Sequence, residues 1–571
     1  MAGGNGSSLE AGPSWGQLQH LASAYSSPIL LTAVSLALTT LFVYVLAVGS
    51  GRSRQPPALP DPIPGLFNGL QFFLYNEAFM NRVRRYMVKS PILTFWQARK
   101  RVYLVSGRKN VQTVFAKWRH INNEGIMLEL NLPTWYRFTK DDVRRWATDR
   151  SGRARNPLPG TEGTPHHQRY FHGYEHVHTE YLSKPQWLNP LVDHYHRQIR
   201  ATVEGYDYHG DWSELSVLHW WRHDVTRCAV HTMLGPRIFE VRPDFCNLFW
   251  DFDERIFDLA IGFPRWMYPT PHRVQREYLD ALQGYLDAAY QNFDYDDPAA
   301  LEAPWEPNFG AQVSRQVVDW FKKSGFTSKD TAAGALGILV WAENSNAIPI
   351  GEWMLMEVAR DADLRLALRE EVRSAYDVDP VTGRRTLDLR KFGALPLLSS
   401  VYHESLRMSM SYNMIRDVAE EFELEKYKIK KGSWVQVPTL VAHYDEDAWG
   451  VPDHPATEFW AERNIKYVEE RDDLGNVSRK RVFDMSGRSG SYFPYGGGNL
   501  ICPGRQFAKQ EITLTVGLLL EMYDFEFSRW VKLDGSPSDR GARHFWQYCG
   551  SGSAPPDRDM IMKIRRAADS A

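Results

Sequence analysis

The sequence is poor in cysteine and has no excess of charge of either sign. Its 571 residues include only 4 cysteines (Cys228, Cys246, Cys502 and Cys549), and no two of them form a C-x-x-C pair. So few cysteines exclude a disulfide scaffold, and the missing pair argues against a multi-cysteine zinc site. The 67 Lys and Arg residues nearly balance 69 Asp and Glu residues, so the chain as a whole has no basic character. We therefore expect no nucleic acid partner.

Apolar runs long enough to span a membrane are equally scarce. There is one, ILLTAVSLALTTLFVYVLAV at residues 29–48, with neither charge nor proline. At the rise of an α-helix it spans roughly 30 Å, the thickness of a bilayer's hydrocarbon core. Arg52 and Arg54 follow it, and the positive-inside rule then places the rest of the chain on the cytoplasmic side. A cleaved signal peptide would need a shorter apolar core after basic residues, and neither is present.

These features predict the order of segments along the chain. Residues 1–28 would be lumenal, with the Asn5-Gly-Ser sequon open to glycosylation, and residues 29–48 would be the transmembrane helix. Residues 49–66 are rich in proline and would form a stiff, extended linker or a spacer that sets a catalytic domain against the membrane. No domain boundary is visible within residues 67–571.

Patterning within residues 67–571 predicts a mainly α domain with small β pieces. The pattern over residues 329–376 indicates two long helices broken near Pro349, and residues 395–410 also have helical spacing. Residues 422–429 and 433–441 are rich in β-formers, and a helix is expected from about residue 503 to 523. The aromatic segment 257–268 fits either a substrate-access lid that touches the membrane or core packing.

The stretch FPYGGGNLICPGR, residues 493–505, is the most informative in the sequence. Gly496 to Gly498 permit backbone conformations that a side chain would block and allow close approach to a flat ligand. Pro503 suits the first position of a helix, so Cys502 is expected at a helix N-terminus, where free N–H groups lower a thiol pKa. Such a thiolate can be a nucleophile, a redox sensor or an axial ligand to iron, and a buried structural cysteine is the alternative.

A charge pair lies upstream on a predicted helix. Glu404 and Arg407 are three residues apart and so share a helix face. Such a pair is usually a solvated surface contact. Here its surroundings in the sequence are apolar: Leu397, Leu398, Val401, Leu406 and Met408. We therefore expect a buried pair, which needs a third hydrogen-bonding partner to be stable.

Four motifs, taken in order, make the chain resemble the cytochrome P-450 family of haem-thiolate enzymes. They are Glu404-x-x-Arg407, HYDEDAWGVPD at residues 443–453, FWAER at residues 459–463 and CPGRQFA at residues 502–508. Each motif is weak alone, but their order and spacing resemble those of the family. The apolar run and the Pro-Pro-x-x-Pro segment after it resemble the microsomal members. The resemblance implies the mainly α cytochrome P-450 fold with small β-sheets, preceded by a single N-terminal transmembrane helix.

The resemblance also implies roles for single residues. Cys502 would be the axial ligand to the iron of haem b, and Arg463 would join Glu404 and Arg407 as the third member of their network. In this family an acid and a threonine usually stand on the helix over the haem and help to protonate bound oxygen. Here Ser345 takes the place of the acid and Asn346 that of the threonine.

Asn346 resembles the residue found in the branch that contains bile-acid sterol hydroxylases and prostacyclin synthase. An amide can orient a water that relays protons, but it is not a hydroxyl donor. A kink residue beside Pro349 is the plainer alternative for Asn346. Because that branch contains both oxygen-inserting enzymes and an isomerase, this helix leaves the type of reaction open.

Other positions depart from the family pattern around the cofactor. Tyr495 stands in place of the usual phenylalanine seven residues before the cysteine, and Gly498 belongs to the loop that would approach the haem. Leu500 replaces the common Arg or His that pairs with a haem propionate. Arg416 matches another propionate-binding position of the family and would carry more of that interaction.

The resemblance implies a membrane-anchored monooxygenase that uses O2 and NADPH-derived electrons. Its substrate would be a lipophilic small molecule, such as a terpenoid, sterol or alkaloid intermediate of secondary metabolism. The electron donor would be NADPH-cytochrome P-450 reductase, and the protein would reside in the endoplasmic reticulum membrane with its catalytic domain in the cytoplasm. One alternative is a haem-thiolate isomerase or dehydratase that acts on a pre-oxidised lipid without a reductase. Another is a non-haem membrane protein in which Cys502 is structural.

Overall fold

The computed structural model describes Ser35 and residues 55–63, 65–97, 99–208, 210–471, 477–545 and 551–568. The predicted lumenal segment 1–28 and, Ser35 apart, the predicted membrane helix 29–48 lie outside these residues, as do the Asn5 sequon and Cys549. Within the described ranges, no helix combines the length and the apolar character needed to cross a bilayer.

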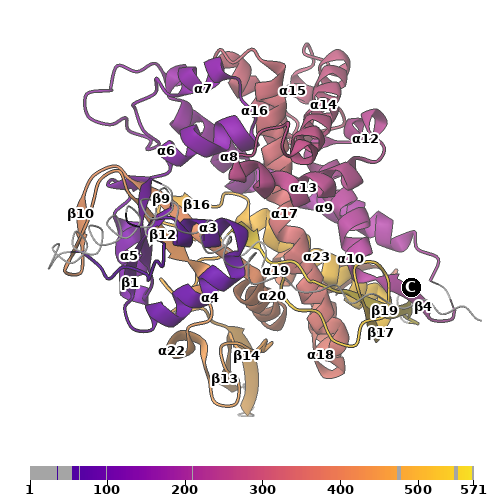
Figure 1. The fold of residues 1–571 in the computed structure, drawn as a ribbon. Helices are drawn as coiled ribbons and strands as arrows, with labels where there is room; N and C mark the ends of the chain where they lie inside the picture. The colour runs from indigo at the N-terminus through magenta and orange to yellow at the C-terminus, as the bar shows by residue number, and fades with distance from the viewer. Residues whose placement is uncertain are drawn as a thin grey trace, which may run out of the picture.

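Helices form most of the described molecule, as the sequence patterns predict, and α17 runs through its centre (Figure 1). The longer helices are α3 (Phe67–Leu74), α4 (Asn76–Met87), α5 (Arg108–Ala116), α7 (Lys140–Trp146), α8 (Tyr170–Ser183), α9 (Pro185–Glu204), α11 (Thr226–Leu234), α13 (Phe245–Ile261), α14 (Pro269–Asn292), α16 (Gln312–Lys323), α17 (Lys329–Arg360), α18 (Ala362–Arg373), α20 (Pro396–Ser409) and α23 (Arg505–Met522). Shorter helices are α6 (Glu124–Ile126), α10 (Val217–Trp220), α12 (Arg237–Val241), α15 (Pro298–Glu302), α19 (Leu389–Gly393), α21 (Thr439–Ala442) and α22 (Glu446–Trp449). Two π-helical turns (Met127–Trp135 and Trp221–Val225) and a 3-10 turn (His166–Gln168) complete the set.

The strands gather mainly in two sheets and several hairpins. The larger sheet has the order β1 (Ile92–Gln97), β2 (Lys100–Val105), β12 (Trp434–Pro438), β9 (Met410–Val418) and β18 (Ser551–Ser553), with β3 (Ile121–Asn122) paired to β9. The second sheet joins β17 (Tyr523–Val531), β19 (Asp559–Arg566) and β4 (Ser213–Ser216). The hairpins are β5 (Trp305–Glu306) with β6 (Gly310–Ala311), β7 (Tyr376–Val378) with β8 (Arg385–Leu387), β10 (Phe422–Leu424) with β11 (Tyr427–Ile429), β13 (Ile465–Arg471) with β14 (Val477–Phe483), and β15 (Gly496–Gly497) with β16 (Leu500–Ile501).

Both faces of the larger sheet are covered by helices because its strands are apolar on both sides. On β2, Val102 and Leu104 pack into the cluster that contains α4, whereas Tyr103 and Val105 pack into the one that contains α5. This alternation follows the two-residue period of a strand. The predicted β segment at residues 422–429 is confirmed as the hairpin of β10 and β11. Of the segment at residues 433–441, residues 434–438 form a strand of this sheet, whereas residues 439–441 belong to the helix α21.

The long helix α17 corrects one prediction. A break near Pro349 was expected, but the helix continues through that residue to Arg360. A proline in a helix leaves the carbonyl four residues earlier without its amide donor. Here that carbonyl, of Ser345, accepts a hydrogen bond from the hydroxyl of Ser553 at 3.1 Å. The strand β18 thus replaces the missing donor, and the helix needs no break.

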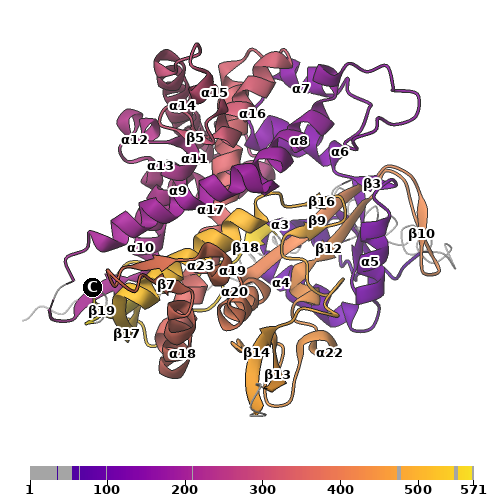
Figure 2. The same ribbon diagram turned by 180° about the vertical axis from the view of Figure 1, so that it is seen from behind.

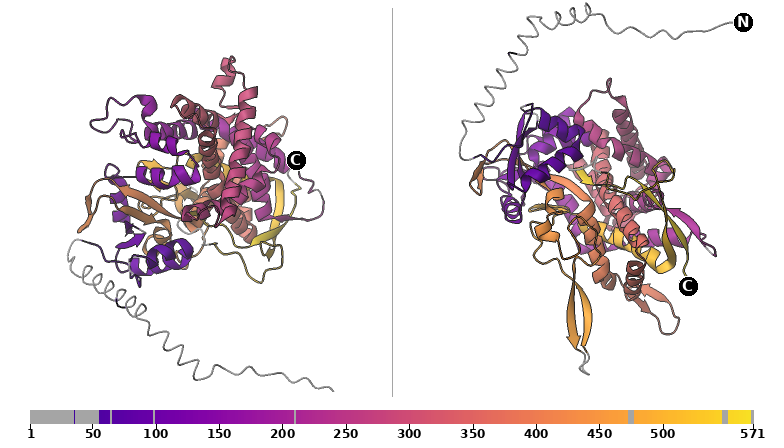
Figure 3. Two further views of the ribbon diagram at one scale, coloured as in Figure 1. Left: turned by 45° about the horizontal axis from the view of Figure 1, so that its top comes forward. Right: turned by 60° about the horizontal axis from the view of Figure 1, so that its bottom comes forward.

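The helix α23 lies next to α17 and determines where the cysteine loop sits. It packs against both α17 and α9, and Figure 2 shows it alongside α9 in the view from behind. Every residue from Glu511 to Met522 is buried, so this part of the helix is enclosed on all sides and not on one face alone. The hairpin of β13 and β14 lies apart from this core and projects from the body of the molecule (Figure 3).

Candidate functional site

Cys502 lies in a tight loop between β16 and α23. Its backbone amide donates to the carbonyl of Tyr495 at 2.9 Å. Gly498 has a φ of +68°, which favours glycine, and a Cβ on Gly497 would lie 2.4 Å from the ring of Phe115. The glycines therefore allow the loop to close against Phe115, and this closure fixes the position of Cys502.

The helix after the cysteine begins at Arg505, two residues later than the predicted start at Pro503. Cys502 has exposed surface, but this residue lines a cavity within the protein, where the surrounding chain removes its thiol from bulk water. Burial raises the pKa of its thiol above the ordinary 9.0, whereas hydrogen bonds from the backbone of Gly504 and Arg505 lower it. The expectation of a thiol pKa lowered by the helix terminus is therefore wrong for the protein alone, since burial outweighs the amides.

The cavity that Cys502 lines has a volume of about 540 Å³ and is bounded by α17, α23 and the cysteine loop. This size is typical of small-molecule and cofactor sites. Apolar side chains from several elements contribute to its wall: Met127, Leu182, Met233, Leu339, Ile350 and Phe507. Such a wall favours a flat apolar group or a lipophilic ligand over a polar one.

Arg416, on β9, is a buried cation that lines the same cavity. It donates to the carbonyl of Ile415 at 2.8 Å and, within the described part of the chain, forms no ion pair. Burial lowers its pKa to about 10. Arg153 lines the cavity as well, but Glu175 matches its charge at 2.7 Å. A buried guanidinium without an anion is costly, and a haem propionate would supply that anion.

Tyr495 and Gly498 are the two remaining residues expected at the cofactor, and they differ in whether they line the cavity. Tyr495 lines the cavity, and its hydroxyl hydrogen-bonds with that of Tyr402 on α20. The oxygen that distinguishes it from phenylalanine therefore has a partner. Gly498 is not among the residues of the cavity wall, and a Cβ there would lie 2.9 Å from the carbonyl oxygen of Phe115. Its positive φ and this close approach support a conformational role, and contact of Gly498 with the cofactor stays a prediction.

Asn346, on α17, lines the cavity and is tied to β18. Its Oδ1 accepts a hydrogen bond from the amide of Ser553 at 3.1 Å, and its Nδ2 donates to Oγ of Ser345 at 3.3 Å. Ser345 is not part of this cavity wall, but it lines a smaller cavity of about 80 Å³ together with Asn346. Protein groups thus orient the amide of Asn346, which stands between the two cavities.

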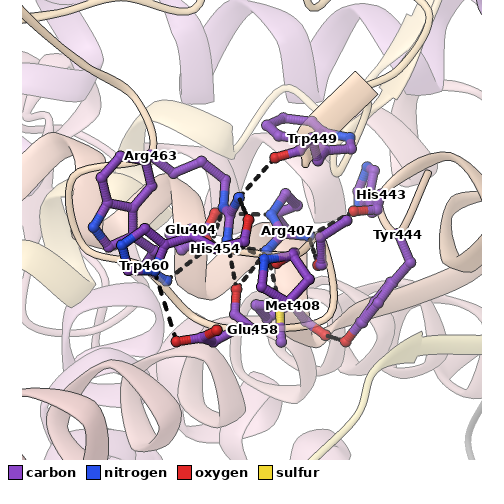
Figure 4. Close-up of polar contacts among 12 residues, drawn as sticks. Glu404, Arg407, Met408, His443, Tyr444, Trp449, His454, Glu458, Trp460 and Arg463 are labelled. Carbon is purple, nitrogen blue, oxygen red and sulfur yellow. Dashed lines mark hydrogen bonds and ion pairs between the residues drawn. The ribbon is translucent and has the colours of Figure 1, made fainter. Parts of the chain in front are cut away.

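Glu404 lies at the centre of a dry charge network (Figure 4). Arg407 donates to both carboxylate oxygens at 2.8 Å, and Nε of Arg463 donates to Oε1 at 2.7 Å. The amide of Trp460 adds a bond at 3.1 Å. All three charged side chains are completely buried. Arg463 therefore occupies the place of the third partner that a buried pair requires.

The remaining donors of the two arginines bind backbone carbonyls. Nη1 of Arg407 donates to the carbonyl of His443 at 2.7 Å, and Nη1 of Arg463 donates to that of Trp449 at 2.6 Å. The ring of His443 in turn accepts a hydrogen bond from the amide of Phe493 at 3.2 Å. The network thus joins α20, the irregular segment after α21 and the start of the cysteine loop.

Sequence reasoning missed two carboxyls in the cavity wall, Glu343 on α17 and Glu511 on α23. Glu511 lies at helical spacing from the buried Leu514 and Leu518, so a charged residue within an apolar stripe was visible in the sequence. Glu343 carries no such signal, because its neighbours on the helix include both polar and apolar residues. Its position becomes apparent only when α17 and α23 are placed together.

A thiol, an unmatched buried cation and apolar walls suit an iron porphyrin, so the fold and cavity describe an enzyme of the haem-thiolate class. The family model for cytochrome P450 matches residues 245–537, and the chain belongs to that family. The family uses a cysteine-ligated haem, and this enzyme is a haem-thiolate monooxygenase.

Particular relatives extend the match along the chain. A cytochrome P450 monooxygenase of Penicillium decumbens, calL, is 35% identical over 94% of this chain and 98% of its own. Cholesterol 7-alpha-monooxygenase of Cricetulus griseus is 28% identical over 56% of this chain and 58% of its own. The solved structure of retinoic acid bound cyanobacterial CYP120A1 gives a TM-score of 0.60 at 16% identity, covering 90% of this chain and 100% of that one, and so shows the same fold. The predicted family and its sterol hydroxylase-like branch are confirmed.

Proposed function

We propose that Cys502 is the thiolate ligand of the haem iron and that the cavity beside it receives a lipophilic molecule for oxygen insertion. One observation carries the assignment: of the cysteines that the structure describes, Cys502 lines the cavity, whereas Cys228 and Cys246 are buried in the helical core. Bound haem would supply the activation of dioxygen, with a thiolate ligand favouring O–O cleavage. The protein would position the substrate and exclude water.

The proposed substrate class is a terpenoid, sterol or alkaloid intermediate of secondary metabolism. The apolar wall supports this class because burial of an apolar skeleton is favourable at about 25 cal/mol per Å². The names of two similar proteins point the same way, since one acts on cholesterol and the other was solved with retinoic acid. Arg416 would hold a propionate, and Asn346 would orient water at the cavity wall.

We further propose a single-pass anchor at residues 29–48 in the endoplasmic reticulum membrane, with the catalytic domain cytoplasmic. Exposed apolar side chains on two segments support contact with a lipid surface: Leu70, Phe73 and Leu74 on α3, and Trp266 and Met267 after α13. Trp266 is 80% exposed, which supports the membrane-touching lid over core packing for this end of the segment.

The proposed electron donor is NADPH-cytochrome P450 reductase. Lys509 on α23 lines a surface groove together with Arg479, Lys480 and Arg481 of β14. A basic groove next to the helix that follows Cys502 supports docking of an acidic partner. An acidic flavoprotein docked there would deliver electrons from the side of the cysteine loop.

The test combines a spectrum with turnover. The reduced protein should give the thiolate type of carbon-monoxide band, and Cys502→Ala should lose it while Cys228→Ala, the matched control at a buried thiol, keeps it. Incubation with reductase, NADPH and candidate lipophiles should give a product one oxygen heavier by mass spectrometry. Product formed equally well without NADPH and reductase would instead favour the isomerase or dehydratase, and a normal band in Cys502→Ala would refute the ligand assignment.

A further inference from the structure

A smaller cavity of about 80 Å³ adjoins the cavity that Cys502 lines. Asn346 on α17 and Gly552 on β18 belong to the walls of both cavities. A Cβ on Gly552 would lie 2.7 Å from Oδ1 of Asn346, so the glycine backbone lies directly against this amide. The boundary between the two cavities is therefore a contact between one side chain and one glycine.

The wall of the smaller cavity is mainly aromatic and proline side chains: Trp250, Phe257, Trp341, Pro349, Phe545 and Pro555. Its volume suits a few waters, or a polar group and the carbon that bears it, and is too small for a whole substrate. The proposed haem takes up part of the larger cavity, so a substrate with several rings needs further room. The smaller cavity therefore suits one end of a molecule whose remainder lies beside Cys502.

Three charged residues also line the smaller cavity: Arg222, Asp253 and Glu254. Glu254 is exposed, whereas protein contacts fix the other two. Nε of Arg222 donates to Oε1 of Glu352 at 3.1 Å, and Nε1 of Trp341 donates to Oδ1 of Asp253 at 2.8 Å. Within the described part of the chain, both Nη groups of Arg222 and Oδ2 of Asp253 have no hydrogen-bond partner. Two oriented side chains thus keep hydrogen-bonding capacity beside the smaller cavity.

Arg222 and Asp253 are near each other without being in contact. Burial raises the pKa of Asp253 to about 7, and the hydrogen bond from Trp341 and the charge of Arg222 oppose this rise. Arg222 forms its ion pair with Glu352, and among the described residues none joins it to Asp253. A donor and an acceptor therefore border one cavity with a gap between them, which a bridging group can fill.

The charges of the two residues decide which group fits this gap best. An ammonium group would bind Asp253 but would meet the positive charge of Arg222. A carboxylate would bind Arg222 but would meet the negative charges of Asp253 and Glu254. A hydroxyl is neutral and both donates and accepts, so it can bond to the two residues at once. Since the pKa of Asp253 is about 7, its carboxyl is partly protonated at neutral pH, and a hydroxyl bonds to either form.

We propose that the smaller cavity recognises a hydroxyl group of the substrate, which donates to Asp253 and accepts from Arg222 while the rest of the molecule lies beside Cys502. The proposal rests on the proposed function, since it concerns the same lipophilic substrate. The substrate class is then an alcohol, a lipophile that already carries oxygen at one end. A reaction that installs or unmasks a hydroxyl, such as an earlier hydroxylation, a carbonyl reduction or an ester hydrolysis, must precede this enzyme.

The first test compares probes that share a skeleton and differ in one hydroxyl: cholestanol with cholestane, and farnesol with farnesene. Spectral titration of the haem-loaded protein gives a dissociation constant for each probe without turnover. In at least one pair the alcohol should bind about tenfold more tightly than its hydrocarbon, because the hydrocarbon leaves Asp253 and Arg222 unpaired. Equal affinities within both pairs would overturn the proposal.

Variants then locate the preference. Asp253→Leu should bring the alcohol close to the hydrocarbon in affinity and leave the hydrocarbon's own affinity nearly unchanged. Asp251→Leu is the matched control, because Asp251 is an exposed acid on the same helix and lines neither cavity, and it should keep the wild-type preference. Asp253→Asn keeps an acceptor for Trp341, so it serves if the leucine variant does not fold, and it should lose several-fold of the preference.

The guanidinium is tested together with its partner. Arg222→Met/Glu352→Met removes both charges of the ion pair, so no unpaired buried carboxylate is left behind. This double variant should also lose most of the preference for the alcohol. A wild-type preference that survives in it and in the Asp253 variants would mean that the smaller cavity holds only water, and the proposal would fail.

Analogues of cholestanol with another polar group at the same carbon test the choice of a hydroxyl. The ketone, the amine and the carboxylic acid should each bind several-fold more weakly than the alcohol to the wild-type protein. An analogue that matches or exceeds the alcohol would overturn the assignment.

The failures of the two proposals are distinguishable. If the wild-type protein lacks the thiolate carbon-monoxide band, or if it binds none of the probes, the proposed function fails. If the band is normal and lipophiles bind with no preference for a hydroxyl, the recognition site alone fails.

Discussion

The hydroxyl of Ser553 donates to the carbonyl oxygen of Ser345 at 3.1 Å, four residues before Pro349 in the central helix. The amide of the same serine binds Oδ1 of Asn346. A strand that begins more than two hundred residues later thus supplies the hydrogen bonds that hold the cavity-facing turn of α17.

Ser553→Ala should destabilise the protein. It removes the donor that replaces the missing amide of Pro349, and an unsatisfied buried carbonyl costs about 1–3 kcal/mol. Denaturant unfolding should show this loss in ΔG. Ser374→Ala, which removes an exposed hydroxyl that bonds a helix-end carbonyl at 2.6 Å, is the matched control and should change ΔG far less. Equal effects of the two changes would mean that the Ser345 carbonyl needs no protein donor.

Arg407→Ala should leave little folded protein. It strands the Glu404 carboxylate in a dry site, and breaking a buried ion pair from one side costs about 3–5 kcal/mol. Arg144→Ala is a matched control, since Arg144 also binds an acid three residues before it but lies on the surface. An exposed pair contributes about 0–1 kcal/mol, so that variant should behave like wild type. Normal haem-loaded yield of Arg407→Ala would contradict the role given to the network.

Arg416→Met should have opposite effects on the two forms of the protein. Without haem, the change removes a buried cation that has no ion-pair partner among the described residues, so the haem-free protein should become more stable. With haem, it removes the proposed partner of a propionate, so haem should dissociate several-fold faster. Thermal melting of the haem-free form and transfer of haem to an acceptor protein measure the two effects. If both forms shift in the same direction, Arg416 does not bind the propionate.

Acid should weaken the link between the charge network and the cysteine loop. Burial lowers the pKa of His443 to about 3, so its ring stays neutral and accepts the hydrogen bond of Phe493 in the folded state. The unfolded chain takes up this proton near pH 6.5, so stability is full above that pH and falls as pH drops from 6.5 toward 3. Haem loss followed against pH should steepen across this window, and less so in His443→Gln. A slope unchanged by that substitution would exclude His443 as a cause.

Much of the fold follows from sequence because it depends on local patterning. The helix at residues 396–409 and the strands within residues 422–429 and at 434–438 match the expected periods. The charged side chains of Glu404, Arg407 and Arg463 could be grouped by motif, although they come from separate segments.

What could not be foreseen from the sequence depends on distant contacts. Pro349 predicts a helix break by the local rule, and only the distant Ser553 removes the need for one. The thiol of Cys502 follows the rule for helix termini in part, but burial by the rest of the chain dominates its pKa. Glu343 and Glu511 belong to helices far apart in sequence, so their convergence has no local signature.

The buried network around Glu404 also bears on the order in which the chain assembles. Arg463 lies 59 residues beyond Glu404, and Phe493 lies 50 residues beyond His443. A long loop of the chain must therefore close before each of these hydrogen bonds can form. Loop closure of this kind is entropically costly and slows folding. We therefore expect the helical core to form early and the cysteine loop to settle last, so that a newly made chain becomes competent to take up haem only at the final stage of its folding.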